Sequence, residues 1–462
     1  MDKRVVALLA VGAAVTAMSS GQDHSAAAAG DTDPATKRVL AHRAAPPDRP
    51  ELAALLRGNN SKEKRTRSLE DWVEQQESDT GVLRTTAQSI DDLDAAQVQD
   101  LLFIAGDLQR DIAEVINDYG SQDHLLELDK NLKTTYPGVY AGMTLSQAQE
   151  PTVVTFNGAP PNQALRMVEG VPASIDVVYG DLLPEAEVQD WLDSIQRSLA
   201  PMTGLPQASF DSTAQRFEVV VPRSSTVSDQ KIIDAIGVLP SGTALGPIAR
   251  TLSDNEATAD EDNVIRGGGS LNETGCTAGF VVRHRSTAAK LLSTAGHCPV
   301  SGGSTNESYQ LRGVDGWTVT GMGYGNRIYF HEGSPDFAYL SIPSYRQPYP
   351  SVYITYSQKR EVGAYYSSRL PKNTWVCHFG RTTEHSCAKV DSPSINLGRP
   401  GGSGAVAVHA NVLAPGDSGG PWWRSQSAVG THKGKVSSTD QRSVYSPVHM
   451  MKDFGNFAPW TT

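Results

Sequence analysis

The second half of the chain is a series of short runs rich in Val, Tyr, Thr and Ala, and each run is soon interrupted by Gly, Pro, Ser or Asn. β-Branched and aromatic residues favour strands, and the interrupting residues favour turns. The runs that predict strands include CTAGFVVRH, KLLSTAGHC, DFAYLSI, TWVCHFG, GAVAVHA and SVYSPVHMM. A succession of short strands with turns between them indicates an all-β barrel or sandwich. Residues 263–462 are numerous enough for two small barrels packed together.

The first half has a different pattern, which predicts helices and then a mixture of strands and helices. Residues 30–67 are rich in Ala, Pro, Arg and Asp, and predict a linker without regular structure. A helical part is expected over 68–138, with one helix from SLEDWVEQQ and a long amphipathic helix over 90–119. An α/β part is expected over 139–262, where PTVVTFNG, ASIDVVYG and QRFEVVVP predict strands between helices. That part ends in an acidic linker.

Charge is divided unevenly between the two halves. The chain has a net charge of −11, yet residues 264–462 carry 19 Lys and Arg against 11 Asp and Glu. The residues before them carry 21 basic side chains against 40 acidic ones. Opposite net charges favour docking of one half on the other. The basic residues are dispersed and follow no nucleic-acid-binding motif, so we expect no nucleic-acid partner.

The N-terminus, MDKRVVALLAVGAAVTAMSS, has a basic start, an apolar run of about a dozen residues and then small residues. This pattern predicts a secretory signal peptide over residues 1–29, cleaved after Ala17 or at the end of the alanine run at Ala29. The run is short for a membrane span. We therefore expect a secreted, extracellular protein without a membrane-embedded part.

All four cysteines lie in the second half of the chain. An even number of cysteines in an exported chain predicts disulfides, with three possible connectivities. Clustering along the sequence favours Cys276–Cys298 and Cys377–Cys387, and each short loop would stabilise the fold by roughly 3 kcal/mol. Neither pair has the close spacing typical of zinc ligands. We predict no metal site and no cofactor.

The stretch LAPGDSGGPWW places Ser418 among glycines. The string from Gly416 to Gly420 fits the G-x-S-x-G turn, which presents a serine nucleophile in α/β-hydrolases and in one class of peptidases. A serine needs a base to accept its proton, and an imidazole base needs an acceptor to orient it. STAGHC supplies His297, and GSPDFAYLSI supplies Asp336 at the start of an apolar run.

The order of these residues distinguishes the two classes. His297 comes first, Asp336 second and Ser418 last, whereas α/β-hydrolases run from serine to acid to histidine. An α/β-hydrolase would have to use Asp440 and His449 after the serine. Too few residues then remain for the intervening parallel strands, because each crossover needs a dozen or more. The α/β-hydrolase interpretation is therefore rejected.

STAGHC and PGDSGGP in this order, with VCHFGRTTEHSC between them, resemble chymotrypsin-fold serine peptidases of the bacterial branch that includes alpha-lytic protease and the streptogrisins. The resemblance implies two six-stranded antiparallel barrels over residues 263–462, with the active site between them. It also implies that Ser418 is the nucleophile, His297 the general base and Asp336 the carboxylate that orients the base. The N–H groups of Gly416 and Ser418 would form the oxyanion hole. Such an enzyme would act as a monomer on protein or peptide substrates.

The same resemblance implies a role for the first half. Members of this branch carry a large pro-region that assists folding, inhibits the enzyme and is then removed. It places the mature N-terminus near Asp262, so that the processing cut follows Glu261. If the enzyme matures itself, that cut is a cleavage after glutamate.

The substrate pocket is expected between two segments. One wall would contain Val412, Leu413 and Pro415, and the other would be AVGTHKGK, with His432, Lys433 and Lys435. Glutamate-specific members of the wider family have a histidine at the place of His432, and an imidazole can bind a substrate carboxylate. The sequence therefore predicts a preference for Glu or Asp before the cleaved bond. The alternatives are a small or apolar pocket, a secreted esterase on the same fold, and a catalytically silent relative that binds proteins.

Overall fold

The computed structural model describes residues 38–462 with internal gaps. The segments left out are 59–60, 79–80, 147–149, 204–206, 213, 223–224, 252–264, 272–274, 299–305, 309–323, 332–334, 343–346, 356–357, 398–403, 410–413 and 437–441. Residues Lys37–Thr462 form one compact unit, separate from Met1–Thr36. The predicted signal peptide, the acidic linker and the processing site Glu261–Asp262 lie outside the described residues. Among the described helices, none is both long and apolar enough to cross a membrane.

The first part of the compact unit is helical. Its helices are α1 (Pro50–Leu56), α2 (Lys62–Glu74), α3 (Ala95–Asp107), α4 (Ile112–Tyr119) and α5 (Gln122–Thr135), with short strands β2 (Val82–Leu83), β3 (Ser89–Ile90) and β4 (Leu93–Asp94). The prediction of an irregular segment over 30–67 is wrong for its described end, which contains α1 and half of α2. Pro50 begins the first helix, and the hydroxyl of Ser61 caps the second by accepting from the Lys64 N–H. Both helices bury leucines in a core shared with α3.

The predicted helix over 90–119 is also wrong in its extent, because it is two helices. Asp94 and Gln97 form a reciprocal capping box at the start of α3, and the Asp111 side chain caps α4. Between them Gln109 has a φ of 52°, a left-handed conformation that ends the first helix. The apolar spacing continues across the break, since both helices face the same core.

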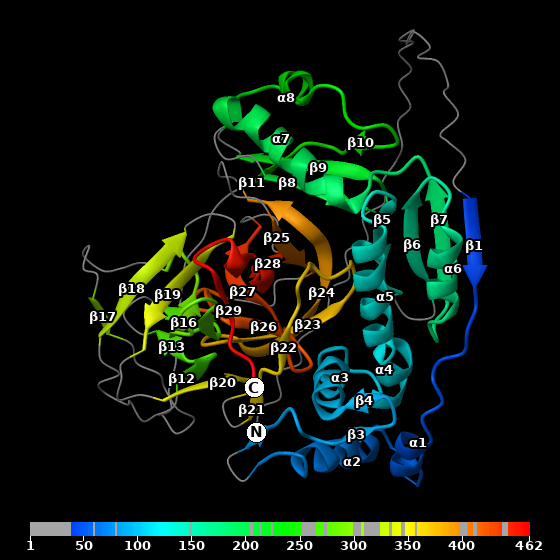
Figure 1. Ribbon diagram of the computed structural model, residues 1–462, viewed down its shortest axis with the longest axis vertical. Helices are drawn as coiled ribbons and strands as arrows, with labels where there is room; N and C mark the ends of the chain where they lie inside the picture. Colours follow the sequence, from blue (N-terminus) through cyan, green and yellow to red (C-terminus); the bar gives the residue numbers. More distant parts are fainter. Residues whose placement is uncertain are drawn as a thin grey trace, which may run out of the picture. The chain divides into compact units, whose positions relative to one another are not determined.

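The α/β alternation predicted after residue 139 is observed. Strands β1 (Arg38–His42), β7 (Ile175–Gly180), β6 (Thr152–Asn157) and β5 (Tyr140–Thr144) form one sheet in this order, with α6 (Asn162–Glu169) connecting its parallel pair β6 and β7. Strands β8 (Gln207–Asp211), β9 (Arg216–Pro222), β10 (Ala244–Leu245) and β11 (Ala249–Thr251) follow, with α7 (Glu185–Thr203) and α8 (Asp229–Ile236). Figure 1 shows α7 lying across β8 and β9.

The second half is built from strands, as predicted. One antiparallel sheet of six strands has the order β17 (Asn306–Ser308), β18 (Tyr324–His331), β19 (Phe337–Ser341), β16 (Lys290–Thr294), β15 (Val281–His284) and β29 (Phe457–Pro459). The other is built on β23 (Trp375–Gly380), β24 (Glu384–Asn396), β25 (Ala405–Val408), β26 (Pro421–Arg424), β27 (Ser427–Lys435) and β28 (Ser443–Pro447). Smaller elements are β12 (Ile265–Gly267), β13 (Ser270–Leu271), β14 (Cys276–Thr277), β20 (Pro348–Tyr353), β21 (Lys359–Glu361), β22 (Ala364–Tyr365) and the 3₁₀ helix η2 (Val448–Lys452). This is the double six-stranded architecture of a chymotrypsin-like domain.

Disulfides join the cysteines in the favoured pairing, Cys276–Cys298 and Cys377–Cys387. The first ties the loop after β16 to β14. The second spans the hairpin of β23 and β24, where the two cysteines stand opposite each other.

The two halves share sheets. Strand β8 of the first half pairs with β24 of the second, with Ser209 opposite Ile395. Strand β2 pairs with β21, with Val82 opposite Lys359. Backbone hydrogen bonds therefore run from one half into the other, and one apolar core contains residues of both.

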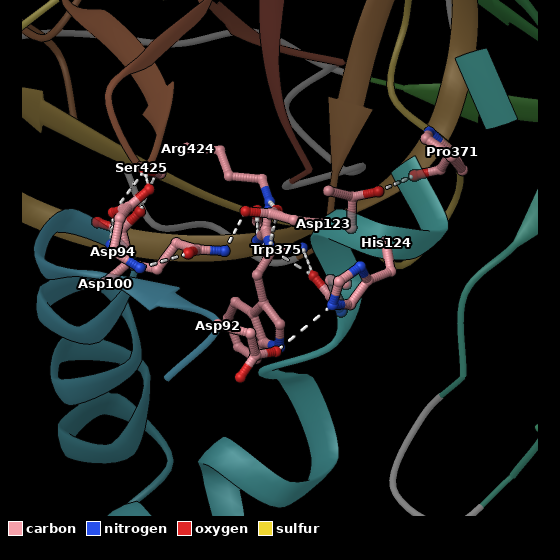
Figure 2. Close-up of polar contacts among 12 residues, drawn as sticks. Asp92, Asp94, Asp100, Asp123, His124, Pro371, Trp375, Arg424 and Ser425 are labelled. Carbon is pink, nitrogen blue, oxygen red and sulfur yellow. Dashed lines mark hydrogen bonds and ion pairs between the residues drawn. The ribbon is translucent and has the colours of Figure 1, made fainter. Parts of the chain in front are cut away.

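Ion pairs and hydrogen bonds also join the two halves, with acidic groups from the first half and basic groups from the second, as the uneven composition predicts. Figure 2 shows the turn after β26 held between acidic side chains of the helical part. The Arg424 guanidinium donates to Asp123 Oδ1 from Nε at 2.7 Å, and the Ser425 N–H donates to Asp100 Oδ2 at 2.6 Å. The Ser425 hydroxyl donates to Asp94 at 2.8 Å. The acidic front half thus neutralises buried basic groups of the second half.

Candidate functional site

Three residues far apart in the sequence meet where the loops next to β16, β19 and β26 come together. His297 Nε2 lies 3.0 Å from Ser418 Oγ, and His297 Nδ1 lies 2.5 Å from Asp336 Oδ2. His297 follows β16, Asp336 precedes β19, and Ser418 occupies the turn before β26. The structure therefore brings the predicted triad within hydrogen-bond distance in the predicted order.

Asp336 is held rigidly at the base of the site. Its side chain is fully buried, its Oδ1 accepts from the His297 backbone N–H at 2.9 Å, and its own N–H donates to Ser446 Oγ at 2.8 Å. Burial by itself would raise the pKa of this carboxyl. The positive charge of Lys433 and the contacts with His297 outweigh burial and hold the pKa below its ordinary value. Asp336 is therefore ionised at neutral pH and oriented toward the imidazole.

The turn that carries Ser418 depends on glycine. Gly416 and Gly419 have φ values of 101° and 92°, which side chains rarely adopt. A Cβ on Gly419 would also lie 2.1 Å from Thr294 Oγ1 and 2.2 Å from the Thr277 carbonyl oxygen. The Thr277 N–H donates to the Ser418 carbonyl at 2.7 Å, which fixes the turn against β14.

The Asp417 side chain stabilises this turn, a role that was not predicted from the sequence. Its buried carboxylate accepts from the Ala414 N–H, the Thr382 N–H and the Thr383 hydroxyl, each at 2.8 Å. Burial raises the pKa of this carboxyl, and the hydrogen bonds oppose that shift. The two adjacent threonines in VCHFGRTTEHSC were the sequence signal for hydrogen-bond donors to a buried carboxylate.

Two backbone donors lie beside the serine. Within the described residues, the N–H groups of Gly416 and Ser418 donate to no acceptor, whereas those of Asp417, Gly419 and Gly420 are paired within the turn and β27.

Of the predicted pocket residues, Pro415, His432, Lys433 and Lys435 lie within the described residues. Val412 and Leu413 lie outside the described residues. Pro415 is half-buried, and its carbonyl accepts from the Thr382 hydroxyl at 2.8 Å. Lys433 turns to Asp336, with 3.6 Å between Nζ and Oδ2, while Lys435 lies half-buried at the end of β27.

His432 is 2% exposed and forms part of an aromatic cluster. Burial, with a contribution from the charge of His297, lowers its pKa to about 3, so its imidazole is neutral at ordinary pH in the ligand-free protein. Its Nδ1 has no hydrogen-bond partner within the described residues. The ring stands against Trp422 and against His378, whose centroid is 5.4 Å away.

His378 itself was not identified from the sequence. It is fully buried on β23, and within the described part of the chain neither ring nitrogen has a partner. Burial lowers its pKa well below the ordinary value. A histidine in the middle of the apolar run TWVCHFG was the available signal.

One described group could be mistaken for a metal site. The potential ligand atoms of Cys377, His385 and Cys387 lie within 4.8 Å of one another. Both sulfurs are already joined in a disulfide, and a thiolate is the form that binds metal.

The chain is similar in structure to bacterial chymotrypsin-fold serine proteases. Cellulomonas bogoriensis chymotrypsin is 21% identical, and the match covers 43% of this chain and 99% of that one with a TM-score of 0.33. Nocardiopsis protease is 23% identical, with coverage of 43% and 99% and a TM-score of 0.33. A further match, described as a glutamic acid specific serine protease that utilizes a novel histidine triad in substrate binding, is 22% identical, with coverage of 42% and 100% and a TM-score of 0.35. No family model and no curated protein matches the sequence.

Proposed function

We propose that this chain is a secreted serine endopeptidase made as a larger precursor. The supporting observation is the continuous contact from Ser418 Oγ through His297 to a buried, ionised Asp336. Nucleophile, base, orienting acid and oxyanion donors are the parts that acyl transfer needs.

The geometry supports the following sequence of steps. Ser418 Oγ attacks the carbonyl carbon of the scissile peptide bond while His297 Nε2 accepts the hydroxyl proton. The negative charge on the carbonyl oxygen is stabilised by the N–H groups of Gly416 and Ser418. His297 then donates the proton to the leaving amine, which leaves an acyl group on Ser418. A water molecule, deprotonated by His297, attacks this ester; His297 then returns that proton to Ser418 Oγ as the bond to the acyl group breaks, which releases the second product. Asp336 stabilises the imidazolium in both steps.

The first half serves in this proposal as a pro-region that assists folding. Its support is the shared core, the strand pairs β8–β24 and β2–β21, and the acidic groups that meet Arg360 and Arg424. These contacts cover apolar and basic surface of the second half. Inhibition by the first half, monomeric state and export stay predictions.

Processing provides the direct test. We expect wild-type protein recovered from the medium to begin at Asp262, and the Ser418→Ala variant to retain the residues before it, because cleavage after Glu261 would require the chain's own nucleophile. N-terminal sequencing of both proteins shows whether the cut depends on Ser418. Identical processing of both would show that another protease makes the cut, and a separate assay of hydrolysis would then be needed to retain the proposal.

Preference for Glu or Asp before the cleaved bond is the finer part of the proposal. A substrate carboxylate against His432 would stabilise the charged imidazole and offset the burial that keeps it neutral. We expect kcat/KM for a glutamyl peptide to exceed that for the alanyl analogue, and His432→Val to reduce this ratio by roughly 10-fold or more, the effect of losing a charge-assisted hydrogen bond. His409→Val is the matched control, since His409 is half exposed and pairs with Asp391. Equal rates for both peptides in the wild type would instead indicate a small or apolar pocket.

A further inference from the structure

A lysine lies beside the acid of the proposed triad. Lys433 Nζ is 3.6 Å from Asp336 Oδ2, the same oxygen that lies 2.5 Å from His297 Nδ1. The Asp336 side chain is fully buried, and the Lys433 side chain is only 18% exposed. One buried carboxylate oxygen therefore faces two groups that can carry positive charge.

A backbone irregularity explains why the lysine is there. In the pairing of β27 with β28, His432 is opposite Tyr445 and Gly434 is opposite Val444, so that Lys433 is an extra residue in the ladder. Such a bulge redirects a side chain. Gly434 has a φ of 145°, which only glycine adopts readily. The bulge allows His432 to enter the core while the next side chain extends to Asp336.

We propose that Lys433 is a positioning residue for catalysis, which holds Asp336 ionised and extends the activity of the proposed peptidase to lower pH. This inference rests on the proposed function. The groups that face the carboxylate are His297, from the loop after β16, and Lys433, from β27. The charge of Asp336 also acts on His432 and partly opposes the lowering of its pKa. Ser446 adds a neutral contact through the Asp336 N–H.

The sign of the effect follows from charge. Burial raises the pKa of the Asp336 carboxyl, and the positive charge of Lys433 is the largest of the effects that lower this pKa below its ordinary value. Only the ionised carboxylate can orient His297 and stabilise the imidazolium. Without Lys433, burial is opposed only by the contacts with His297, and Asp336 becomes protonated at a higher pH. The acid limb of the activity therefore moves to higher pH when Lys433 is removed.

The test is the pH profile of kcat/KM on a chromogenic peptide. We expect Lys433→Met to move the midpoint of the acid limb upward by about 1 pH unit, a typical effect of one nearby charge. Lys433→Arg should restore the wild-type position. Lys290→Met is the control, because it removes an exposed lysine of β16 whose Nζ lies over the Trp460 ring, and it should leave the limb in place.

Failure of this inference and failure of the proposed function give different results. A Lys433→Met profile that coincides with the wild type would overturn the role of Lys433 while the hydrolysis itself remains. Absence of Ser418-dependent hydrolysis in the wild type at any pH would overturn the function. If Lys433→Met does not fold, Lys433→Gln keeps a polar side chain and is subject to the same expectation. The rate of labelling of Ser418 by a fluorophosphonate, followed across pH, gives a second readout of the same limb.

Discussion

Replacing Ser418 with alanine is expected to lower kcat/KM for peptide hydrolysis by roughly 10⁴–10⁶-fold, the range seen when a nucleophile of this kind is removed. Ser418 Oγ is the atom that lies 3.0 Å from His297 Nε2. His297→Ala should cause a loss of similar size. The double variant should be no slower than either single variant, because the two residues act as one unit.

The measurement is steady-state hydrolysis of peptide substrates by purified full-length and processed protein. Ser286→Ala serves as the control, since Ser286 lies on an exposed turn, where its hydroxyl accepts from Asn456. Additive losses in the double variant would contradict the proposed unit. Unchanged hydrolysis in Ser418→Ala would place the nucleophile elsewhere and end the proposal.

Arg360→Met is expected to destabilise the uncleaved chain by about 3–5 kcal/mol, the cost of leaving a buried charge without its partner. Arg360 is 1% exposed. Its guanidinium donates to Asp100 Oδ1 at 2.8 Å, to Gln99 Oε1 at 2.6 Å and to the Ser425 carbonyl at 2.7 Å. Removing it leaves the Asp100 carboxyl buried, in a helix of the other half, without its main counter-charge, and burial already raises the pKa of this carboxyl.

This prediction tests whether the two halves are one cooperative structure. Denaturant unfolding in a Ser418→Ala background avoids self-cleavage. We expect a single transition, and partial recovery of stability in Arg360→Met/Asp100→Leu, since replacing both members of a buried pair is far less costly than breaking it. Arg67→Met, which removes an exposed ion pair with Asp71 on α2, should cost less than about 1 kcal/mol. A loss in Arg360→Met as small as that of this control would show that the contact contributes little to folding.

Local patterns were sufficient for several features. Alternating apolar runs and turn residues predicted the strands of the second half, because strand formation there follows side-chain type. The order of His297, Asp336 and Ser418 predicted that the three residues meet, and the clustering of cysteines predicted both disulfides. Where local signals competed, the outcome was less predictable. Apolar spacing over 90–119 concealed the caps at Asp94 and Asp111 that divide the segment into α3 and α4.

Contacts between segments distant in the sequence could not be predicted from local patterns. Strand β2 has two residues and gains its pairing only because β21, almost 280 positions later, presents a free edge. Asp100 of α3 resembles a solvated helix residue in the sequence, and only packing shows that it is buried and meets Arg360 and Ser425.

By itself, the sequence determined the strand-rich second half, the identity and order of the proposed triad, and the cysteine pairing, since each depends on residue type and spacing. Tertiary structure alone decided the electrostatics. The sequence alone allows the Lys433 side chain to lie in the predicted substrate pocket or beside Asp336. The bulge in β27 places it beside Asp336. Burial made His432 neutral, whereas the charge of Lys433 and the contacts with His297 kept Asp336 ionised in spite of its burial. The charge state of a group depends on its desolvation and on neighbours brought from elsewhere in the chain, and only the packed fold specifies these.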